Sequence, residues 1–275
     1  MMTAMLPART MVLKQLRYYL PTVLVAVGVL ALWEFLVTVL DIQQFLLPKP
    51  SAIYRELASE FSLASDGGSL LLQATGATLF EAVGGFVIGS GLGILVALAT
   101  ARWAAVNQAL LPFAIAANSV PIIAFAPIMN NWFGLTNPAS KMAIVAIIVF
   151  FPVMINTVRG LTLVDRTQLE LMQSYAAKPR KIVWALRVPN ALPYLFSALR
   201  VASSLSVIGA VVGEFFGGPR ATLGVFITQE AAGFNFARAW AAIVMAALIG
   251  IGFYLLVLLA ERRLMPWYAA QRRRV

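Results

Sequence analysis

Six long apolar stretches limit what this chain can fold into more than any other feature of its sequence. A helix that crosses a membrane needs about 20 largely apolar residues. The six stretches are Leu20–Leu40, Leu79–Thr100, Ala109–Met129, Ala143–Val158, Tyr194–Phe215 and Trp240–Ala260. We therefore expect an all-α, polytopic membrane protein with about six transmembrane helices.

The composition agrees with a membrane environment. Of 275 residues, 61% are hydrophobic and 12% are charged, and the mean hydropathy is +0.85. Soluble domains carry about 25% charged residues. The chain has neither Cys nor His, which excludes disulfides, Cys/His metal sites and nucleophiles activated by histidine. We expect no catalytic residue, no cofactor and no metal.

The net charge of +10 suits either a nucleic-acid-binding face or basic loops on one side of a membrane. We favour the loops and expect no nucleic acid partner. Six spans place both termini on one side, with fifteen basic residues: Arg9, Lys14, Arg17, Arg102, Arg159, Arg166, Lys178, Arg180, Lys181, Arg187, Arg262, Arg263, Arg272, Arg273 and Arg274. The other side has four: Lys49, Arg55, Arg220 and Arg238. The positive-inside rule then predicts cytoplasmic N- and C-termini.

This topology divides the chain into four segments. Residues 1–19 form a cytoplasmic N-terminus, residues 20–260 form a transmembrane domain, residues 165–193 form a cytoplasmic loop within it, and residues 261–275 form a basic cytoplasmic tail. The basic residues before the first stretch also suit a signal peptide, but the apolar run is too long and no clean cleavage site follows. A retained signal-anchor helix is the better interpretation.

The third stretch is interrupted by Pro121 and Pro127. Proline frees backbone carbonyls, and irregular backbone at membrane depth is tolerated where it lines a cavity. The alternative is a kinked helix whose end already lies outside the membrane. The polar residues of this region, together with a glutamate at the end of the fifth stretch, are our candidates for the translocation path: Asn118, Ser119, Asn130, Asn131 and Glu214.

Small and acidic residues mark the first two stretches. Gly85, Gly89 and Gly93 recur every four residues, which gives one smooth helix face for close packing. We favour packing within the chain over a subunit interface. Glu34 is a functional candidate because a carboxylate in a membrane is costly, and a hydrogen bond to a neighbouring helix is the alternative. Glu81 is expected near the membrane interface.

The basic segment between the fourth and fifth stretches predicts two short helices. Asp165 or Thr167 can cap the first, in which Leu169, Met172 and Ala176 share one face by their spacing of three and four residues. The pair Lys178–Pro179 ends it, and we expect a second short helix from Arg180 to Arg187. Short helices with an apolar stripe and basic flanks suit docking on a soluble partner.

This segment resembles the "EAA" loop of binding-protein-dependent ABC importer permeases. That pattern has Glu-Ala-Ala, three further residues, Gly, and later Leu-Pro with a second proline nearby. Here Glu170 matches the glutamate, Leu171 and Met172 replace the alanines, and Ala176 replaces the glycine. Val188–Pro189 and Pro193 stand at the later positions.

The resemblance extends over most of residues 45–265. Leu47–Ser51 is similar to the "LPSPS" segment of the permease branch for nitrate, sulfonates and taurine, which also includes importers of pyrimidine thiamine precursors and riboflavin. Pro121, Ala126–Pro127 and Trp132–Gly134 match its third span and exit. Val212–Gly217 matches the end of its fifth span.

The resemblance implies the type I ABC importer permease fold and a non-enzymatic transport subunit of a bacterial inner membrane. The implied partners are two copies of an ABC ATPase, a solute-binding protein, a second permease subunit forming a homodimer, and the lipid bilayer. No Gly-x-x-x-x-Gly-Lys-Ser/Thr motif occurs, so the ATPase is a separate chain. The residues implied to couple to it are Glu170, Leu171, Met172, Ala176, Ala177, Lys178, Pro179 and Pro189.

The residues near the expected path favour an uncharged substrate. Arg200 is the basic residue nearest to membrane depth, and Lys141 lies near a span end. Asn130 and Asn131 beside Trp132 suit a neutral, hydrogen-bonding solute, so we expect a pyrimidine- or riboflavin-like vitamin precursor. A small anion of the nitrate, sulfonate or taurine type is the alternative. A secondary transporter is a weaker one, because no inverted repeat relates the two halves of the chain.

Overall fold

The computed structural model of the chain describes residues 8–65, 68–100, 112, 114, 116, 117 and 119–266. Within this part, five helices are long and apolar enough to cross a membrane: α1 (Ala8–Val39), α3 (Leu70–Thr100), α6 (Pro138–Thr162), α9 (Val188–Phe215) and α11 (Phe236–Leu264). The shorter elements are α2 (Pro50–Ser65), η1 (Ile122–Phe125), α5 (Ala126–Phe133), α7 (Arg166–Ser174), α8 (Pro179–Ile182), η2 (Val183–Arg187) and α10 (Leu223–Ala232). The prediction of an all-α polytopic fold is confirmed.

The predicted third span, Ala109–Met129, differs from the other five. Its residues 109–111, 113, 115 and 118 lie outside the described part. After Pro121 the chain forms η1 and then α5, which together are shorter than a membrane span. Proline has no N–H to donate to the preceding turn, so Pro121 precedes η1 and Pro127 lies in the first turn of α5.

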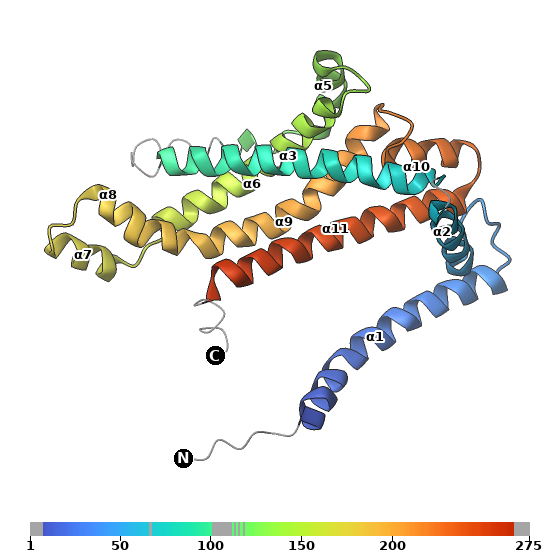
Figure 1. Cartoon of the computed structure of the whole chain (residues 1–275), viewed down its shortest axis with the longest axis horizontal. Coiled ribbons are helices and arrows are strands. Elements are labelled where there is room, and N and C mark those ends of the chain that lie inside the picture. Colours follow the sequence, from blue (N-terminus) through green and yellow to red (C-terminus); the bar gives the residue numbers. More distant parts are fainter. Residues whose placement is uncertain are drawn as a thin grey trace.

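The centre of the bundle is built by α6 and α9, with α3 against them (Figure 1). Half of the most apolar window of α6 and of the α8–α9 helix is buried, against 17% in α11 and 6% in α1. A Cβ at Gly85 would clash with the Val145 side chain, and one at Gly89 would clash with the Ala146 carbonyl oxygen. The glycine face of α3 therefore packs on α6, which confirms packing within the chain.

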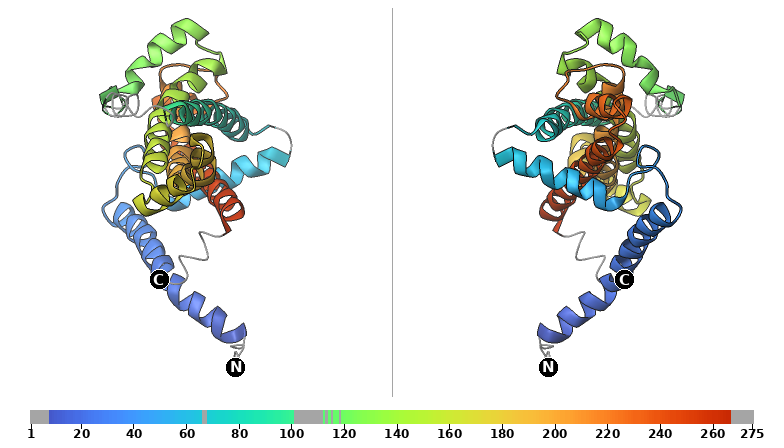
Figure 2. Two further views of the ribbon diagram at one scale, coloured as in Figure 1. Left: turned by 90° about the vertical axis from the view of Figure 1, so that its left-hand side faces the viewer. Right: turned by 90° about the vertical axis from the view of Figure 1, so that its right-hand side faces the viewer.

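Helix α1 leaves the bundle and touches it near its C-terminal end (Figures 1 and 2). Glu34 accepts hydrogen bonds from the Ser51 hydroxyl at 2.8 Å and the Ser51 backbone N–H at 3.1 Å. The rings of Trp33 and Trp240 meet edge to face with centroids 5.2 Å apart. Glu34 therefore has the bonded, structural environment that was the alternative to a functional role.

The two ends of the bundle are different. One end, called here the α7 end, carries α7 and α8, and the opposite end, called the α10 end, carries α2 and α10 (Figure 1). Helix α5 projects from the bundle (Figures 1 and 2). The segment identified as a docking loop and the buried polar residues described below therefore lie toward opposite ends of the same helices.

Candidate coupling helix and translocation path

Helix α7 begins at a side-chain cap. The Asp165 carboxylate accepts the Thr167 backbone N–H at 2.7 Å, which satisfies one of the free N–H groups of the first turn. Of the two caps that the sequence allowed, the structure uses Asp165. Asn190 donates to the carbonyls of Gly160 and Leu163 at 2.8 and 2.9 Å, which fixes the end of α6 to the start of α9. The loop is therefore anchored at its base.

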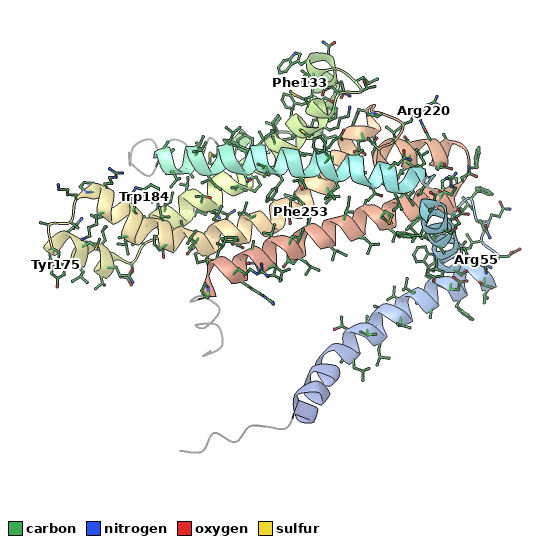
Figure 3. All side chains as sticks on the ribbon, viewed as in Figure 1. Arg55, Phe133, Tyr175, Trp184, Arg220 and Phe253 are labelled. Carbon is green, nitrogen blue, oxygen red and sulfur yellow. The ribbon has the colours of Figure 1, made fainter. Side chains whose placement is uncertain are left out.

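The outward face of α7 combines apolar and charged groups. Leu171 and Tyr175 are 56% and 78% exposed, and they are one helical turn apart. Tyr175 points away from the bundle (Figure 3). Glu170 forms an exposed ion pair with Arg166, with Arg166 Nε 3.0 Å from Glu170 Oε1. An exposed aliphatic and aromatic pair beside a carboxylate suits contact with another protein.

The C-terminus of α7 closes through Ala176, which has a positive φ of 52°. The Ala176 N–H donates to the Gln173 carbonyl at 2.8 Å and the Ala177 N–H donates to the Met172 carbonyl at 3.0 Å. This pair of bonds is the Schellman arrangement, in which the residue after the helix adopts the left-handed conformation. Lys178 then precedes α8, and Pro179 stands in its first turn.

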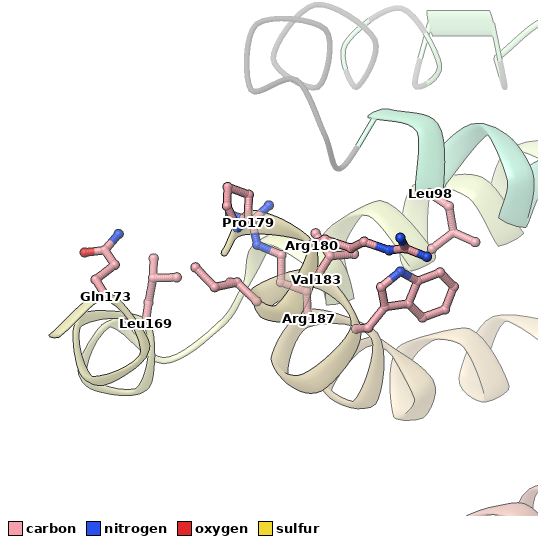
Figure 4. A pocket seen from close by; sticks show the side chains of 9 residues that line it. Leu98, Leu169, Gln173, Pro179, Arg180, Val183 and Arg187 are labelled. Carbon is pink, nitrogen blue, oxygen red and sulfur yellow. The ribbon is translucent and has the colours of Figure 1, made fainter. Parts of the chain in front are cut away.

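The inner face of α7 borders a cavity of about 600 Å³ (Figure 4). Leu169 and Met172, expected on one exposed stripe with Ala176, are half-buried, whereas Ala176 is exposed. The side chains that line the cavity are mostly apolar, with two arginines among them. Its lining residues are Leu98, Leu169, Gln173, Pro179, Arg180, Ile182, Val183, Trp184 and Arg187.

The prediction of a separate short helix from Arg180 to Arg187 was wrong. Helix α8, the π-helical turn η2 and α9 follow one another without a break, so residues 179–215 form one continuous helix. Pro189 lies inside this helix, directly after the π-helical turn η2, and does not end it. The loop therefore consists of one short helix, α7, and the extended start of α9.

The five residues expected in the translocation path have different environments. Asn118 lies outside the described residues, and Ser119 and Asn131 are exposed. Asn130 is 8% exposed and donates to the Phe216 carbonyl at 3.2 Å. Glu214 is fully buried and accepts the Gly224 N–H at 2.6 Å. Of the four that the structure describes, two are therefore exposed and two are buried.

Sequence reasoning missed a buried charged group at the α10 end of the bundle. Lys141 is fully buried and donates to Asn130 Oδ1 at 3.1 Å and to the Leu135 carbonyl. Glu81, expected at the membrane interface, is 1% exposed. The position of Glu81 in a long apolar run could have indicated this burial, since a charged residue there needs a partner inside the protein. In the described part of the chain no acidic residues form a metal-binding cluster.

Comparison with known proteins agrees with the fold and the loop. Residues 89–266 match the family described as binding-protein-dependent transport system inner membrane component. The chain is 35% identical to the riboflavin transport system permease protein RibX of Chloroflexus aurantiacus, covering 88% of this chain and 87% of that protein. It is 33% identical to the formylaminopyrimidine transport permease protein ThiX of Halalkalibacterium halodurans, covering 88% and 93%.

More distant relatives extend the comparison. The taurine transport system permease protein TauC of Escherichia coli is 26% identical, with 87% of this chain and 86% of that protein covered. A solved structure titled as an amino acid ABC transporter with histidines shares the fold, with a TM-score of 0.57, 18% identity, and coverage of 74% of this chain and 97% of that chain. The chain therefore belongs to the family of binding-protein-dependent ABC transport permeases, in the branch that includes the riboflavin, formylaminopyrimidine, sulfonate and taurine permeases.

Proposed function

We propose that this permease forms the membrane path of an importer for a riboflavin- or pyrimidine-like vitamin precursor. The proposal rests on sequence identity to relatives whose names state a substrate. The relatives at 35% and 33% identity are named for riboflavin and formylaminopyrimidine. Those named for aliphatic sulfonates and taurine have 27% and 26%.

The two basic side chains near membrane depth are both bonded within the protein, which supports a substrate without negative charge. Lys141 is buried and bonded to Asn130 and Leu135. Arg200 forms an ion pair with Glu261, with Arg200 Nε 3.2 Å from Glu261 Oε2. Neither is left to attract an anion. A neutral heterocycle needs hydrogen-bonding and aromatic contacts instead.

The path in this proposal includes Ser119 and Asn131, which are exposed, and Trp132, which follows Asn131 in α5 and is 70% exposed. Asn130 and Glu214 also belong to the proposed path, and both are buried in this conformation. Asn118 completes the proposed set. An exposed indole next to amides suits stacking of a flat ring together with hydrogen bonding to its edge.

The assembly in this proposal has two permease copies, two ATPase subunits and a solute-binding protein. The α7 end lies in the cytoplasm, where the Glu170–Pro179 segment meets the ATPase. The N- and C-termini are cytoplasmic too, and the α10 end faces the solute-binding protein. The excess of Lys and Arg in the loops assigned to the inside supports this orientation. ATP drives transport only if it binds one arrangement of the helices more tightly than the other.

The importer of a small anion is the alternative, favoured by the sulfonate and taurine relatives. Ligand binding by the partner solute-binding protein, followed by ATP-dependent uptake into liposomes that contain the whole transporter, separates the two. We expect riboflavin or a formylaminopyrimidine to bind and to be taken up, and taurine, alkanesulfonates and nitrate to do neither. Uptake of one of these anions, with no uptake of the heterocycles, would contradict the proposal.

A further inference from the structure

Three charged side chains from three different spans are buried together at the α10 end. They are Glu81 of α3, Lys141 of α6 and Glu214 of α9, with exposed fractions of 1%, 0% and 0%. Electrostatic interaction links Lys141 to both glutamates. If all three were ionised, the group would carry a net charge of −1 among apolar helices. An uncompensated buried charge is strongly unfavourable, so the group needs either another cation or a proton.

Glu214 is surrounded by donors that suit an ionised carboxylate. Its Oε2 atom accepts the N–H of Gly224, the second residue of α10, at 2.6 Å. The Thr78 hydroxyl accepts the Leu223 N–H at 2.9 Å and is itself hydrogen-bonded to Glu214. Glu214 itself lies in the last turn of α9, but its carboxylate faces the first turn of α10, where the helix dipole favours an anion. Glu214 is therefore the anion of the pair.

Glu81 supplies the group that Glu214 still lacks. The two carboxyl groups lie within hydrogen-bonding reach of each other. Among the described residues, Glu81 Oε2 and Glu214 Oε1 are buried oxygen atoms that no N–H or O–H group of the protein reaches. Ionised carboxylates only accept hydrogen bonds, so two of them can bond to each other only when one carries a proton. With one proton on Glu81, one of the two oxygen atoms donates a hydrogen bond and the other accepts it.

We propose that the Glu81–Glu214 pair is a proton-holding site in which Glu81 is the acid that donates to the Glu214 carboxylate. With Lys141 charged, the cluster then has no net charge. It connects the start of α10 through Gly224, and the α5–α6 connection through Leu135, to the three central spans. The site holds both segments at the α10 end without leaving an unbalanced charge inside the membrane.

Infrared difference spectra of the purified transporter in lipid at neutral pH test the protonation directly. The wild-type spectrum minus that of Glu81→Gln should show the C=O band of a carboxylic acid. The matched control is Glu261→Gln, which removes a buried glutamate that is ion-paired with Arg200, and its difference spectrum should show carboxylate bands. Carboxylate bands in the Glu81→Gln spectrum would overturn the proposal.

A pair of substitutions of similar size tests the hydrogen bond. Glutamine keeps a donor for Glu214, so Glu81→Gln should insert, transport and melt within about 1 °C of the wild type. Leucine has no donor, so Glu81→Leu should lower the apparent melting temperature by at least about 4 °C. Failure of Glu81→Gln to fold, or equal melting of the two variants, would contradict the assignment of Glu81 as the acid.

Discussion

Ala176 adopts a backbone conformation that alanine does not favour. Its φ of 52° places it in the left-handed region, which costs an L-residue with a Cβ about 1–2 kcal/mol. The EAA pattern has glycine at this position, and the Schellman closure of α7 supplies the physical reason.

We predict that Ala176→Gly stabilises the protein, because removal of the Cβ strain outweighs the extra flexibility of glycine in the unfolded chain. The expected gain is about 0.5–1 kcal/mol, seen as a rise of about 1–4 °C in the apparent melting temperature. Ala177→Gly is the control, because Ala177 follows with a negative φ and glycine there should lower the melting temperature. A lower melting temperature for Ala176→Gly than for wild type would refute the account of the strain.

Helix α7 is the element through which we expect ATP hydrolysis to act on the spans. Its outward face presents Leu171 and Tyr175 beside Glu170. Leu171→Asp or Glu170→Lys should reduce co-purification of the ATPase at least about tenfold, because each change introduces an unpaired or reversed charge into the contact. Membrane insertion should be unchanged, since these side chains are exposed at the end of the bundle.

Two exposed tyrosines provide a matched comparison for this docking face. Tyr175→Asp alters the α7 end, whereas Tyr54→Asp alters α2 at the α10 end, where Tyr54 is 73% exposed. Only the first should lose the ATPase in pull-down experiments. Equal retention of the ATPase by Tyr175→Asp, Leu171→Asp and the wild type would show that α7 is not the docking element.

The elements differ in how much of them the sequence could predict. Long apolar runs predicted the spans because membrane thickness sets helix length, and the glycines of α3 predicted its close packing on α6. Lys141 was not predicted because a lysine in the first turn of a span has the same local pattern whether it reaches the headgroups or bonds inside. Its partners Asn130 and Leu135 belong to α5 and the connection after it, and only the tertiary fold brings them together.

At the scale of the whole molecule, one arginine joins three helices at the α10 end. Arg238 of α11 lies 2.8 Å from Glu60 of α2 and 2.9 Å from Glu230 of α10. Ser69, which immediately precedes α3, donates to the other oxygen of Glu60 at 2.9 Å. Burial raises the pKa of Glu60, but the hydrogen bonds from Arg238 and Ser69 and the charge of Arg238 lower it more, so it lies below its ordinary value of 4.5.

This shift predicts how the stability of the α10 end depends on pH. Because the pKa of Glu60 is lower in the folded state, its contribution is complete above about pH 4.5 and is lost as the pH falls through the folded value. Arg238→Gln should lower the apparent melting temperature at neutral pH by about 4 °C. It should also flatten the further decrease between about pH 5 and pH 3, because Glu60 then titrates near its ordinary value.

Arg220→Gln removes an exposed arginine near the same end and should retain the wild-type profile. Parallel pH profiles for wild type and Arg238→Gln would mean that the ion pair with Glu60 does not set the acid stability.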